Sequence, residues 1–246
     1  MILHQKAKCD RPEFRPALLA DWDDVTFVHY AVAPAELQEH MPFQLDLFEG
    51  SAYISLVAFT QRHLRPRIGG RLAAALAAPL ASHPFLNVRT YVRHQGRQAI
   101  YFLCEWIPNR LATWIGPALY GLPYRLGRLS YQYDRLPEAA HHDVNAGGAR
   151  LVFDAFPASD ASLAQAAPGT LDAFLLERYL AFTRCRGRDA GFRVDHAPWM
   201  QRRATVLIRE TQLLKQTGVQ WDYARPVSCH YSEGARCVGL GPPVTL

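Results

Sequence analysis

Alternation of apolar and polar residues recurs along most of the chain. VTFVHYAV, residues 25–32, is rich in β-branched and aromatic side chains and predicts a strand. Two apolar runs meet at Glu49-Gly50, and two more, within residues 85–106, meet at Gln95-Gly96. A short Gly-containing turn between two such runs predicts a β-hairpin. Further strands are expected near residues 128–134, 151–156, 191–199, 201–209 and 226–232.

Helical signals are fewer. Pro34 suits the first turn of a helix over PAELQEHM, and Asn109 predicts an N-cap before RLATWIGPALY, which Pro117 bends or ends. The longest expected helix is TLDAFLLERYLAFTRCRG, residues 170–187, capped by Thr170 and closed by Gly187. A short helix is expected around TQLLKQTG. Residues 135–148 are expected to form a loop.

The surplus of strands over helices predicts an α+β fold, a large and mostly antiparallel β-barrel or sandwich with a few covering helices. The length and the 49% hydrophobic content allow a sizeable core. The longest apolar tract, LAAALAAPLA at residues 72–81, is too short to span a bilayer. It predicts either an Ala-rich helix packed on the body, or a lid or subunit contact. A homo-oligomer is therefore left open, and no membrane partner is expected.

The expected strand over residues 85–92 divides its side chains between two faces. One face is apolar core, with Leu86, Val88, Thr90 and Val92. The other carries an amide, a guanidinium and a phenol: Asn87, Arg89 and Tyr91. This polar face either meets solvent or lines a cavity in which Arg89 would bind an anion.

Glu105 lies on the second strand of the same hairpin, among aromatic and apolar residues. A buried carboxyl group needs a partner, or it takes up a proton. Arg89 on the neighbouring strand is the candidate partner. The pattern is equally compatible with a structural ion pair and with a catalytic acid.

The stretch YGLPYRLG, residues 120–127, places Tyr124 and Arg125 side by side on a turn that leads into a strand. A cation beside a phenol stabilises the phenolate and lowers the pKa of the tyrosine. Such a pair suits a general acid or hydrogen-bond donor facing an anion, with Tyr120, Tyr91 and Glu105 completing a polar wall. Alternatively, Tyr124 and Arg125 only tie the turn to neighbouring backbone carbonyls.

Charge and cysteine content exclude several classes of protein. The formal net charge is +5, and only Lys6, Lys8 and Lys215 among the 27 basic residues are lysines. The arginines are scattered, so no nucleic-acid surface is expected. The five cysteines form no C-x-x-C pair, and their odd number argues against a disulfide framework. The N-terminal sequence lacks the apolar core of a signal peptide, and a cytoplasmic location is expected.

Motifs for metals, cofactors and nucleophiles are absent from the sequence. It has no G-x-S-x-G elbow and no Walker loop, and no cofactor is expected. His141-His142-Asp143 resembles a metal cluster, but adjacent histidines seldom bind one metal, so no metal site is expected. His29, His196 and His230 lie in strand-like segments and are expected to be structural. Cys104 is expected to be a buried apolar side chain.

Several longer motifs carry a family resemblance. They are WDDVTFVHY, the run from Leu37 through PFQLDLFEGSAYISLVAF, FLNVRTYVR, LYGLPYRLGR, HAPW and HYSEG. From about residue 20 to about residue 240 the chain resembles the YqjF-like family of uncharacterised bacterial proteins, a branch of the acetoacetate decarboxylase-like superfamily. The resemblance implies a single domain over residues 1–246 with a cone-shaped antiparallel β-barrel, flanking helices and a central cavity. Residues 1–20 are expected to form a loosely packed extension.

The resemblance also bears on the turn at Pro123-Tyr124-Arg125-Leu126-Gly127. In the decarboxylases the matching turn reads P-K-K-L-G, and its first lysine forms a Schiff base with a β-keto acid. A phenol cannot form an imine, and a guanidinium is not an amine nucleophile. The Schiff-base chemistry of the superfamily is therefore expected to be lost, and none of the three lysines is expected to replace it.

Two functions follow as hypotheses. In the first, the protein is an enzyme for a small carbonyl compound or carboxylate, with Tyr124, Arg125 and Glu105 catalytic and Asn87, Arg89, Tyr91 and Tyr120 binding the substrate. In the second, it is a non-catalytic binding protein for an apolar or anionic metabolite. An enzyme should place Tyr124 and at least one arginine in a water-accessible cavity, whereas a structural role for the turn predicts no cavity beside Tyr124.

Overall fold

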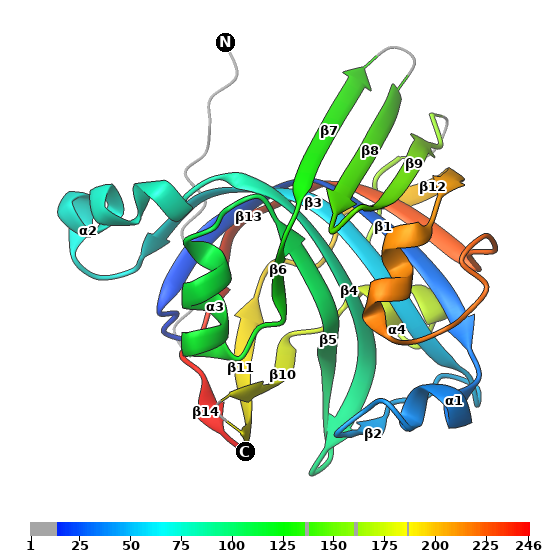
Figure 1. The fold of residues 1–246 in the computed structure, drawn as a ribbon, viewed down its shortest axis with the longest axis horizontal. Coiled ribbons are helices and arrows are strands. Elements are labelled where there is room, and N and C mark those ends of the chain that lie inside the picture. The colour runs from blue at the N-terminus through cyan, green and yellow to red at the C-terminus, as the bar shows by residue number, and fades with distance from the viewer. Residues whose placement is uncertain (1–13, 136–137, 160–161, 186) are drawn as a thin grey trace.

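A computed structural model describes residues 14–135, 138–159, 162–185 and 187–246 of the chain (Figure 1). Its strands are β1 (Leu18–Val32), β2 (Gln44–Leu45), β3 (Ala52–Pro66), β4 (His83–His94), β5 (Arg97–Ile107), β6 (Tyr124–Leu126), β7 (Arg128–Arg135), β8 (Glu138–Ala146), β9 (Ala149–Pro157), β10 (Leu180–Cys185), β11 (Arg188–Asp195), β12 (Arg202–Glu210), β13 (Ser228–Leu240) and β14 (Val244–Thr245). Its helices are α1 (Pro34–Gln38), α2 (Gly70–Ala77), η1 (Ala78–Leu80), α3 (Ala112–Tyr120), α4 (Leu171–Leu176) and η2 (Gln212–Thr217). The predicted α+β class is confirmed.

The long strands pair into a closed ring. Neighbouring strands follow the order β11-β10-β5-β4-β3-β1-β13, and β13 then pairs back onto β11 through Val194↔Leu240 and Asp195↔Gly239. Most of these pairs are antiparallel, as predicted. Two contacts of β5 are parallel instead, one with β10 and one with β6. The expectation of a mostly antiparallel sheet therefore holds, with these two parallel pairs of β5 as exceptions.

A second group of strands continues the sheet beyond β13, in the order β12-β9-β8-β7. These strands extend from the ring at the top of Figure 1. β8 occupies most of the segment for which we expected a loop, residues 135–148. The loop prediction rested on polar residues and on Gly147-Gly148. These glycines have positive φ and form the turn between β8 and β9, and alternation on β8 buries His142 while it leaves His141 half-exposed.

The predicted hairpin at Gln95-Gly96 is confirmed, with both residues at positive φ and β4 paired to β5. Glu49-Gly50 also form a tight turn at positive φ, but only a single bridge, Phe48↔Ser51, joins its two sides. The residues before that turn pair with β4 instead, through β2. The turn was predicted correctly, and the strand pairing around it was not.

The expected helix over residues 170–187 is wrong beyond its first turns. Thr170 caps α4 as predicted, because its hydroxyl accepts a hydrogen bond from Ala173 N. The helix ends at Leu176, and β10 then pairs with β5 and β11. The run LAFTRC alternates as well as it fits a helical stripe. Pairing on both sides of β10 supplies backbone hydrogen bonds that outweigh the local helical preference.

The helices lie around the outside of the ring, with α2 and α3 at the left of Figure 1 and α1 and α4 at the right. α3 packs beside β6 and β10, and Asn109 Oδ1 accepts from Ala112 N at 3.1 Å, which confirms its capping role. α2 projects away from the body at the left of Figure 1. It lies against β3 but has no buried residue, and Leu72 and Leu76 are about three-quarters exposed, so its leucines are not part of the core.

The core has two parts, one on each face of the ring strands. Leu86, Val88 and Val92 of β4 belong to one cluster, and Phe85 and Tyr91 belong to the other. The second cluster also contains Phe27, Val57, Phe102, Phe192, Val194, Trp199 and Val238 from the other ring strands and the segment after β11. This cluster surrounds the cavity described below. The alternation along β4 was predicted correctly, but neither face of the strand is a solvated surface.

The N-terminal part of the described chain is packed rather than loose. β1 begins at Leu18, Ala17 N donates to Leu240 O at 2.7 Å, and the Arg193 guanidinium lies 4.7 Å from the centroid of the Phe14 ring. The expectation of a loose extension is therefore wrong for residues 14–20, and residues 1–13 lie outside the described part of the chain. Within the described residues, no helix combines the length and apolar character that a bilayer crossing requires. Cys104, Cys185 and Cys229 are free thiols, whereas Cys237 is disulfide-bonded.

Candidate functional site

Three polar side chains form one row across neighbouring strands. Asn87 of β4 lies opposite Glu105 of β5, and Glu105 lies opposite Tyr124 of β6. Residues opposite each other in paired strands point to the same face of the sheet. All three line an inner cavity of about 70 Å³. Its remaining wall is mainly apolar and aromatic, with Phe27, Val57, Phe85, Phe102, Phe192 and Trp199 among its residues.

Arg89, two residues beyond Asn87 on β4, lines the same cavity. It is 8% exposed, and its Nη2 donates to Leu175 O at 3.2 Å. Its Nε is buried and has no hydrogen-bond partner among the described residues. Within that part of the chain no carboxylate forms an ion pair with Arg89. Burying a cation without a counter-ion is costly. Arg89 therefore presents uncompensated positive charge to the cavity.

Tyr91 does not line the cavity but supports its wall. Its hydroxyl donates to Leu175 O at 2.8 Å, so Ser55 Oγ, 2.6 Å away, must donate to Tyr91. His29 Nδ1 then donates to Ser55 Oγ at 2.7 Å. Burial and the neighbouring cations lower the pKa of His29 well below its usual value, which matches a neutral ring with its proton on Nδ1. This series of hydrogen bonds fixes the position of Leu175 O, which accepts from both Tyr91 and Arg89.

Glu105 is held as a neutral acid. It is 4% exposed, and burial raises the pKa of its carboxyl group well above the usual value. Its Oε2 is buried without a hydrogen-bond partner among the described residues, and no ion pair with Arg89 forms. The structural ion pair that the sequence left open is therefore absent from the described residues. A protonated Glu105 offers the cavity a hydrogen-bond donor.

Tyr124 lies at the junction of the row with α3. Burial, with the Glu105 and Tyr120 side chains adding to it, raises the pKa of its phenol well above the usual value. Its ring packs edge-on against Phe85, with the ring centroids 5.8 Å apart. A Cβ atom on Gly116 of α3 would come within 2.3 Å of Tyr124 Cε2. The glycine is therefore required by the close approach of the Tyr124 ring, which shapes the cavity wall.

Arg125 points away from this site. Neighbouring residues of a strand face opposite sides, and Arg125 on β6 is exposed, with its Nη1 donating to Gln216 O at 2.8 Å. It is absent from the cavity wall. The expectation that Arg125 lowers the pKa of Tyr124 was wrong, because the pKa of that phenol is raised. Arg89, and not Arg125, lines the cavity that Tyr124 also lines.

Two residues of the cavity wall were missed from the sequence. Arg178 lies just after α4 and forms a buried ion pair with Asp46, Nη1 to Oδ2 at 2.8 Å. The sequence analysis placed Arg178 in the middle of the helix expected over residues 170–187, where nothing in the pattern indicated a role in a site. His196 follows β11, and its Nδ1 lies 2.8 Å from Ala197 O, while burial lowers the pKa of its ring. The sequence analysis expected His196 to be structural, and HAPW, residues 196–199, served there only as a family motif.

A second, apolar cavity of about 210 Å³ adjoins the first. Tyr124, Phe85, Leu122, Phe192, Leu240 and Gln61 line both. Tyr120 lies only on this outer cavity, where its ring meets Phe192 edge-on at 5.1 Å, so it does not join the polar row as expected. The outer wall is completed by α3, by Ala77 and Leu80, and by the end of β3.

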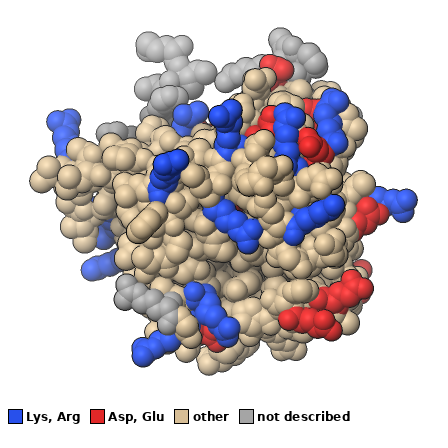
Figure 2. Space-filling view, in the orientation of Figure 1, with Lys and Arg blue, Asp and Glu red and all other residues tan. Residues whose placement is uncertain are grey.

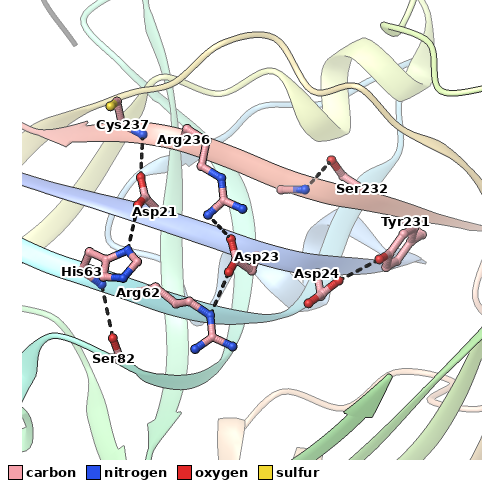
Figure 3. Close-up of polar contacts among 11 residues, drawn as sticks. Asp21, Asp23, Asp24, Arg62, His63, Ser82, Tyr231, Ser232, Arg236 and Cys237 are labelled. Carbon is pink, nitrogen blue, oxygen red and sulfur yellow. Dashed lines mark hydrogen bonds and ion pairs between the residues drawn. The ribbon is translucent and has the colours of Figure 1, made fainter. Parts of the chain in front are cut away.

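A polar groove of about 680 Å³ lies elsewhere, beside β1, β3 and β13 (Figure 3). Asp23 accepts from Arg62 Nε at 2.8 Å and from Arg236 Nη1 at 2.6 Å. Asp24 Oδ1 accepts from the Tyr231 hydroxyl at 2.9 Å. Asp23, Arg62 and Arg236 are thus paired with one another within the protein. The groove is larger than the inner cavity, but the buried cation without a carboxylate partner among the described residues, Arg89, lines the inner cavity.

No group of three or more metal-binding side chains is found in the described part of the chain. His141 Nδ1 lies 2.6 Å from Asp154 Oδ1, whereas the His142 ring stacks on Phe153 at 4.4 Å on the other face of β8. The His141-His142-Asp143 run therefore does not gather into one site. On the face shown in Figure 2, Lys and Arg side chains are dispersed among uncharged residues.

Comparison with known proteins gives one family and one curated relative. A family model described as an uncharacterized conserved protein, DUF2071, matches residues 19–236. The uncharacterized protein YqjF of Bacillus subtilis (strain 168) is 27% identical over 215 residues, which cover 86% of each chain. This bears out the resemblance that the motifs indicated.

Solved structures share the fold at low identity. An acetoacetate decarboxylase-like enzyme from Sphingomonas wittichii RW1 has a TM-score of 0.67 at 15% identity, covering 95% of this chain and 94% of that one. The enduracididine biosynthesis enzyme MppR complexed with pyruvate has a TM-score of 0.65 at 14% identity, covering 95% and 91%. Acetoacetate decarboxylase from Legionella pneumophila has a TM-score of 0.63 at 9% identity, covering 99% and 93%. The chain therefore has an acetoacetate decarboxylase-like fold.

Proposed function

Because the chain belongs to the DUF2071 family of uncharacterized conserved proteins, we propose a function from the chemistry of its inner cavity. The protein binds a small carbonyl compound that carries a carboxylate, and it acts on this compound without a Schiff base. The observation that carries the proposal is a buried arginine, without a counter-ion among the described residues, that lines the same cavity as a neutral acid and a neutral phenol.

Arg89 is the proposed carboxylate-binding residue. A ligand carboxylate would supply the counter-ion that the described residues do not, and would accept charge-assisted hydrogen bonds from the guanidinium. Arg178 lines the same cavity but already neutralises Asp46. The acetoacetate decarboxylase-like fold of an enzyme complexed with pyruvate, a small oxo acid, supports this class of ligand.

Glu105 and Tyr124 are proposed to act on the carbonyl oxygen. Both are held neutral by burial and can donate a hydrogen bond, and Asn87 adds an amide in the same row. Donors fixed around one oxygen stabilise negative charge that develops there, as in an enolate. A general acid in this position could also return a proton to the product.

The absence of an imine step is part of the proposal. Tyr124 occupies the turn at which the resemblance expects the reactive lysine, and Lys215 on η2 is exposed and does not line the inner cavity. Lys6 and Lys8 lie outside the described residues. The proposed chemistry is therefore general-acid and hydrogen-bond catalysis on a carbonyl group rather than covalent catalysis.

A non-catalytic binding protein is the second candidate. The outer cavity is the larger of the two adjoining cavities and is almost wholly apolar, which favours storage or transport of a metabolite. Turnover separates the two candidates, because both predict binding at Arg89.

Further features complete the proposal. The closed ring of strands is taken as the cone-shaped barrel of a single domain over residues 1–246, with the inner cavity at its centre. The exposed apolar side chains of α2 leave a homo-oligomer open. A cytoplasmic location is supported by the free thiols of Cys104, Cys185 and Cys229.

The proposal is tested with purified protein and a panel of small 2-oxo acids, 3-oxo acids and simple carboxylates. Binding is followed by thermal shift, with Arg89→Met beside the wild type, and turnover of each bound compound is followed by proton NMR. Stabilisation of the wild type only, with turnover that Tyr124→Phe slows at least about tenfold, supports the enzyme. Stabilisation without turnover supports the binding protein. Equal shifts in Arg89→Met would exclude the proposed site.

A further inference from the structure

The inner and outer cavities meet at a shared aromatic wall. Tyr124 and Phe85 line both, with their rings edge-on at 5.8 Å, and Leu122 and Phe192 complete the junction. A ligand that fills the inner cavity therefore borders directly on the outer one. The two cavities differ sharply in chemistry, and this difference indicates the shape of the ligand.

The outer cavity carries no charged side chain among its lining residues. Its wall is Leu, Ile, Pro, Ala and aromatic residues, with Gln61, His83 and two tyrosines as the polar exceptions. Burial lowers the pKa of His83 to about 4, so its ring is neutral at physiological pH. The ring also stacks on Phe85, with centroids 4.8 Å apart. A wall of this kind suits an uncharged hydrocarbon segment.

The outer cavity also reaches the surface. Two residues of α3 line the cavity with very different exposure. Ala112 is 8% exposed and lies at the buried end of the cavity wall, whereas Leu119 is 55% exposed and lies where the cavity opens to solvent. A chain that begins at Arg89 could therefore extend past Tyr124 and along α3 toward solvent. A closed apolar cavity would instead limit the ligand to a fixed length.

We infer that the ligand is an acyl-chain carboxylate: a charged, oxygen-bearing head on Arg89 and Glu105, and an unbranched apolar tail along α3 in the outer cavity. This inference rests on the proposed function for the head group and adds the substrate class. Each methylene moved from water into the outer cavity should strengthen binding about fourfold, until the tail reaches solvent.

The test is a series of straight-chain monocarboxylates of increasing length, titrated by isothermal calorimetry against the wild type and two variants. Ile115→Trp enlarges a side chain that lines the outer cavity. Trp114→Ala, one residue earlier on α3, changes a side chain that is 80% exposed and does not line it. Leu119→Trp, at the exposed rim, provides a second blocking variant if Ile115→Trp does not fold.

The expected result is affinity that rises with chain length in the wild type and in Trp114→Ala, and that stays flat in the blocking variant while its short-chain affinity is kept. Short chains that bind with no gain from length would overturn the tail site and leave the proposed head site intact. The matching 1-alkanols form a separate arm. If long alkanols bind as tightly as the carboxylates, and Arg89→Met changes neither, the head assignment fails while the apolar site stands. If no carboxylate or alkanol of any length binds, both assignments fail.

Discussion

Glu105 and Tyr124 lie opposite each other where β5 and β6 run parallel, and their side chains share one buried cavity. Burial raises the pKa of both groups, so each is held in its neutral, hydrogen-bond-donating form. Two neutral acids side by side avoid the repulsion of two buried anions. Arg89 therefore remains the positive charge in this cavity that a ligand would have to neutralise.

The stability of the protein should depend on pH through Glu105. Because the folded pKa is raised, the stability contributed by the protonated carboxyl is complete below about pH 4 and is lost as the pH rises toward the folded pKa. Glu105→Gln keeps the shape of the neutral acid and does not titrate. The variant should match the wild type near pH 4. Above pH 4 it should be more stable than the wild type, by about 1.4 kcal/mol for each pH unit up to the folded pKa of Glu105.

Urea unfolding of both proteins at several pH values measures this difference. His196, which faces the same cavity, titrates in both proteins, whereas the raised pKa of Tyr124 keeps its phenol protonated over this pH range. A stability difference that is constant from acid to neutral pH would mean that Glu105 does not hold a proton.

Replacement of the two arginines of the cavity should change the stability of the protein by different amounts. Arg89→Met removes a buried cation that has no carboxylate partner among the described residues, so the free energy of unfolding should change by less than about 1 kcal/mol. Arg178→Met leaves Asp46 short of a buried partner and should cost about 3 kcal/mol. Chemical denaturation of the ligand-free variants measures both. Similar losses in the two variants would mean that Arg89 is satisfied within the protein.

Gly116 should be coupled to Tyr124. A methyl group at Gly116 would overlap the Tyr124 ring, so Gly116→Ala should destabilise the wild type by about 1–3 kcal/mol. In a Tyr124→Ala background the same change should cost much less, because the ring is gone. A double-mutant cycle on unfolding free energies measures the coupling. Additive effects of the two changes would show that the ring does not depend on the glycine.

Arg125 should be dispensable for ligand binding. Its guanidinium is exposed and bonds Gln216 O, so Arg125→Ala should cost less than about 1 kcal/mol in stability and leave carboxylate affinity unchanged. Calorimetric titration of the same carboxylate into Arg125→Ala and Arg89→Met compares the two arginines directly. A tenfold loss in Arg125→Ala would return Arg125 to the site.

Much of the cavity could be predicted because strand alternation is local. The period of β4 alone placed Asn87 and Arg89 on one polar face and left open whether that face meets solvent or a cavity, and the structure shows that both side chains line the inner cavity. The same rule, applied to Tyr124 and Arg125, would have separated them, since adjacent residues of a strand cannot share a face. We assigned both residues to a turn, because Gly121 and Pro123 precede them, whereas both belong to β6.

Other features depend on contacts between distant segments. The end of α4 at Leu176 follows from the pairing of β10 with β5 and β11, and no local pattern in residues 170–187 reports it. Arg178 consequently reaches Asp46, which lies more than a hundred residues earlier in the chain. The neutral state of Glu105 likewise depends on its burial and on the lack of a cation paired with it among the described residues. Such facts follow from tertiary packing rather than from spacing.

The central claim is that Arg89 holds a ligand carboxylate within reach of Glu105 and Tyr124. A crystal structure of the protein soaked with a small oxo acid such as 2-oxobutanoate tests it most directly. The account predicts the carboxylate on the Arg89 guanidinium, with the carbonyl oxygen within hydrogen-bond distance of Glu105 or Tyr124. A bound ligand in the groove between Asp23 and Arg236, with the inner cavity holding only water, would contradict it.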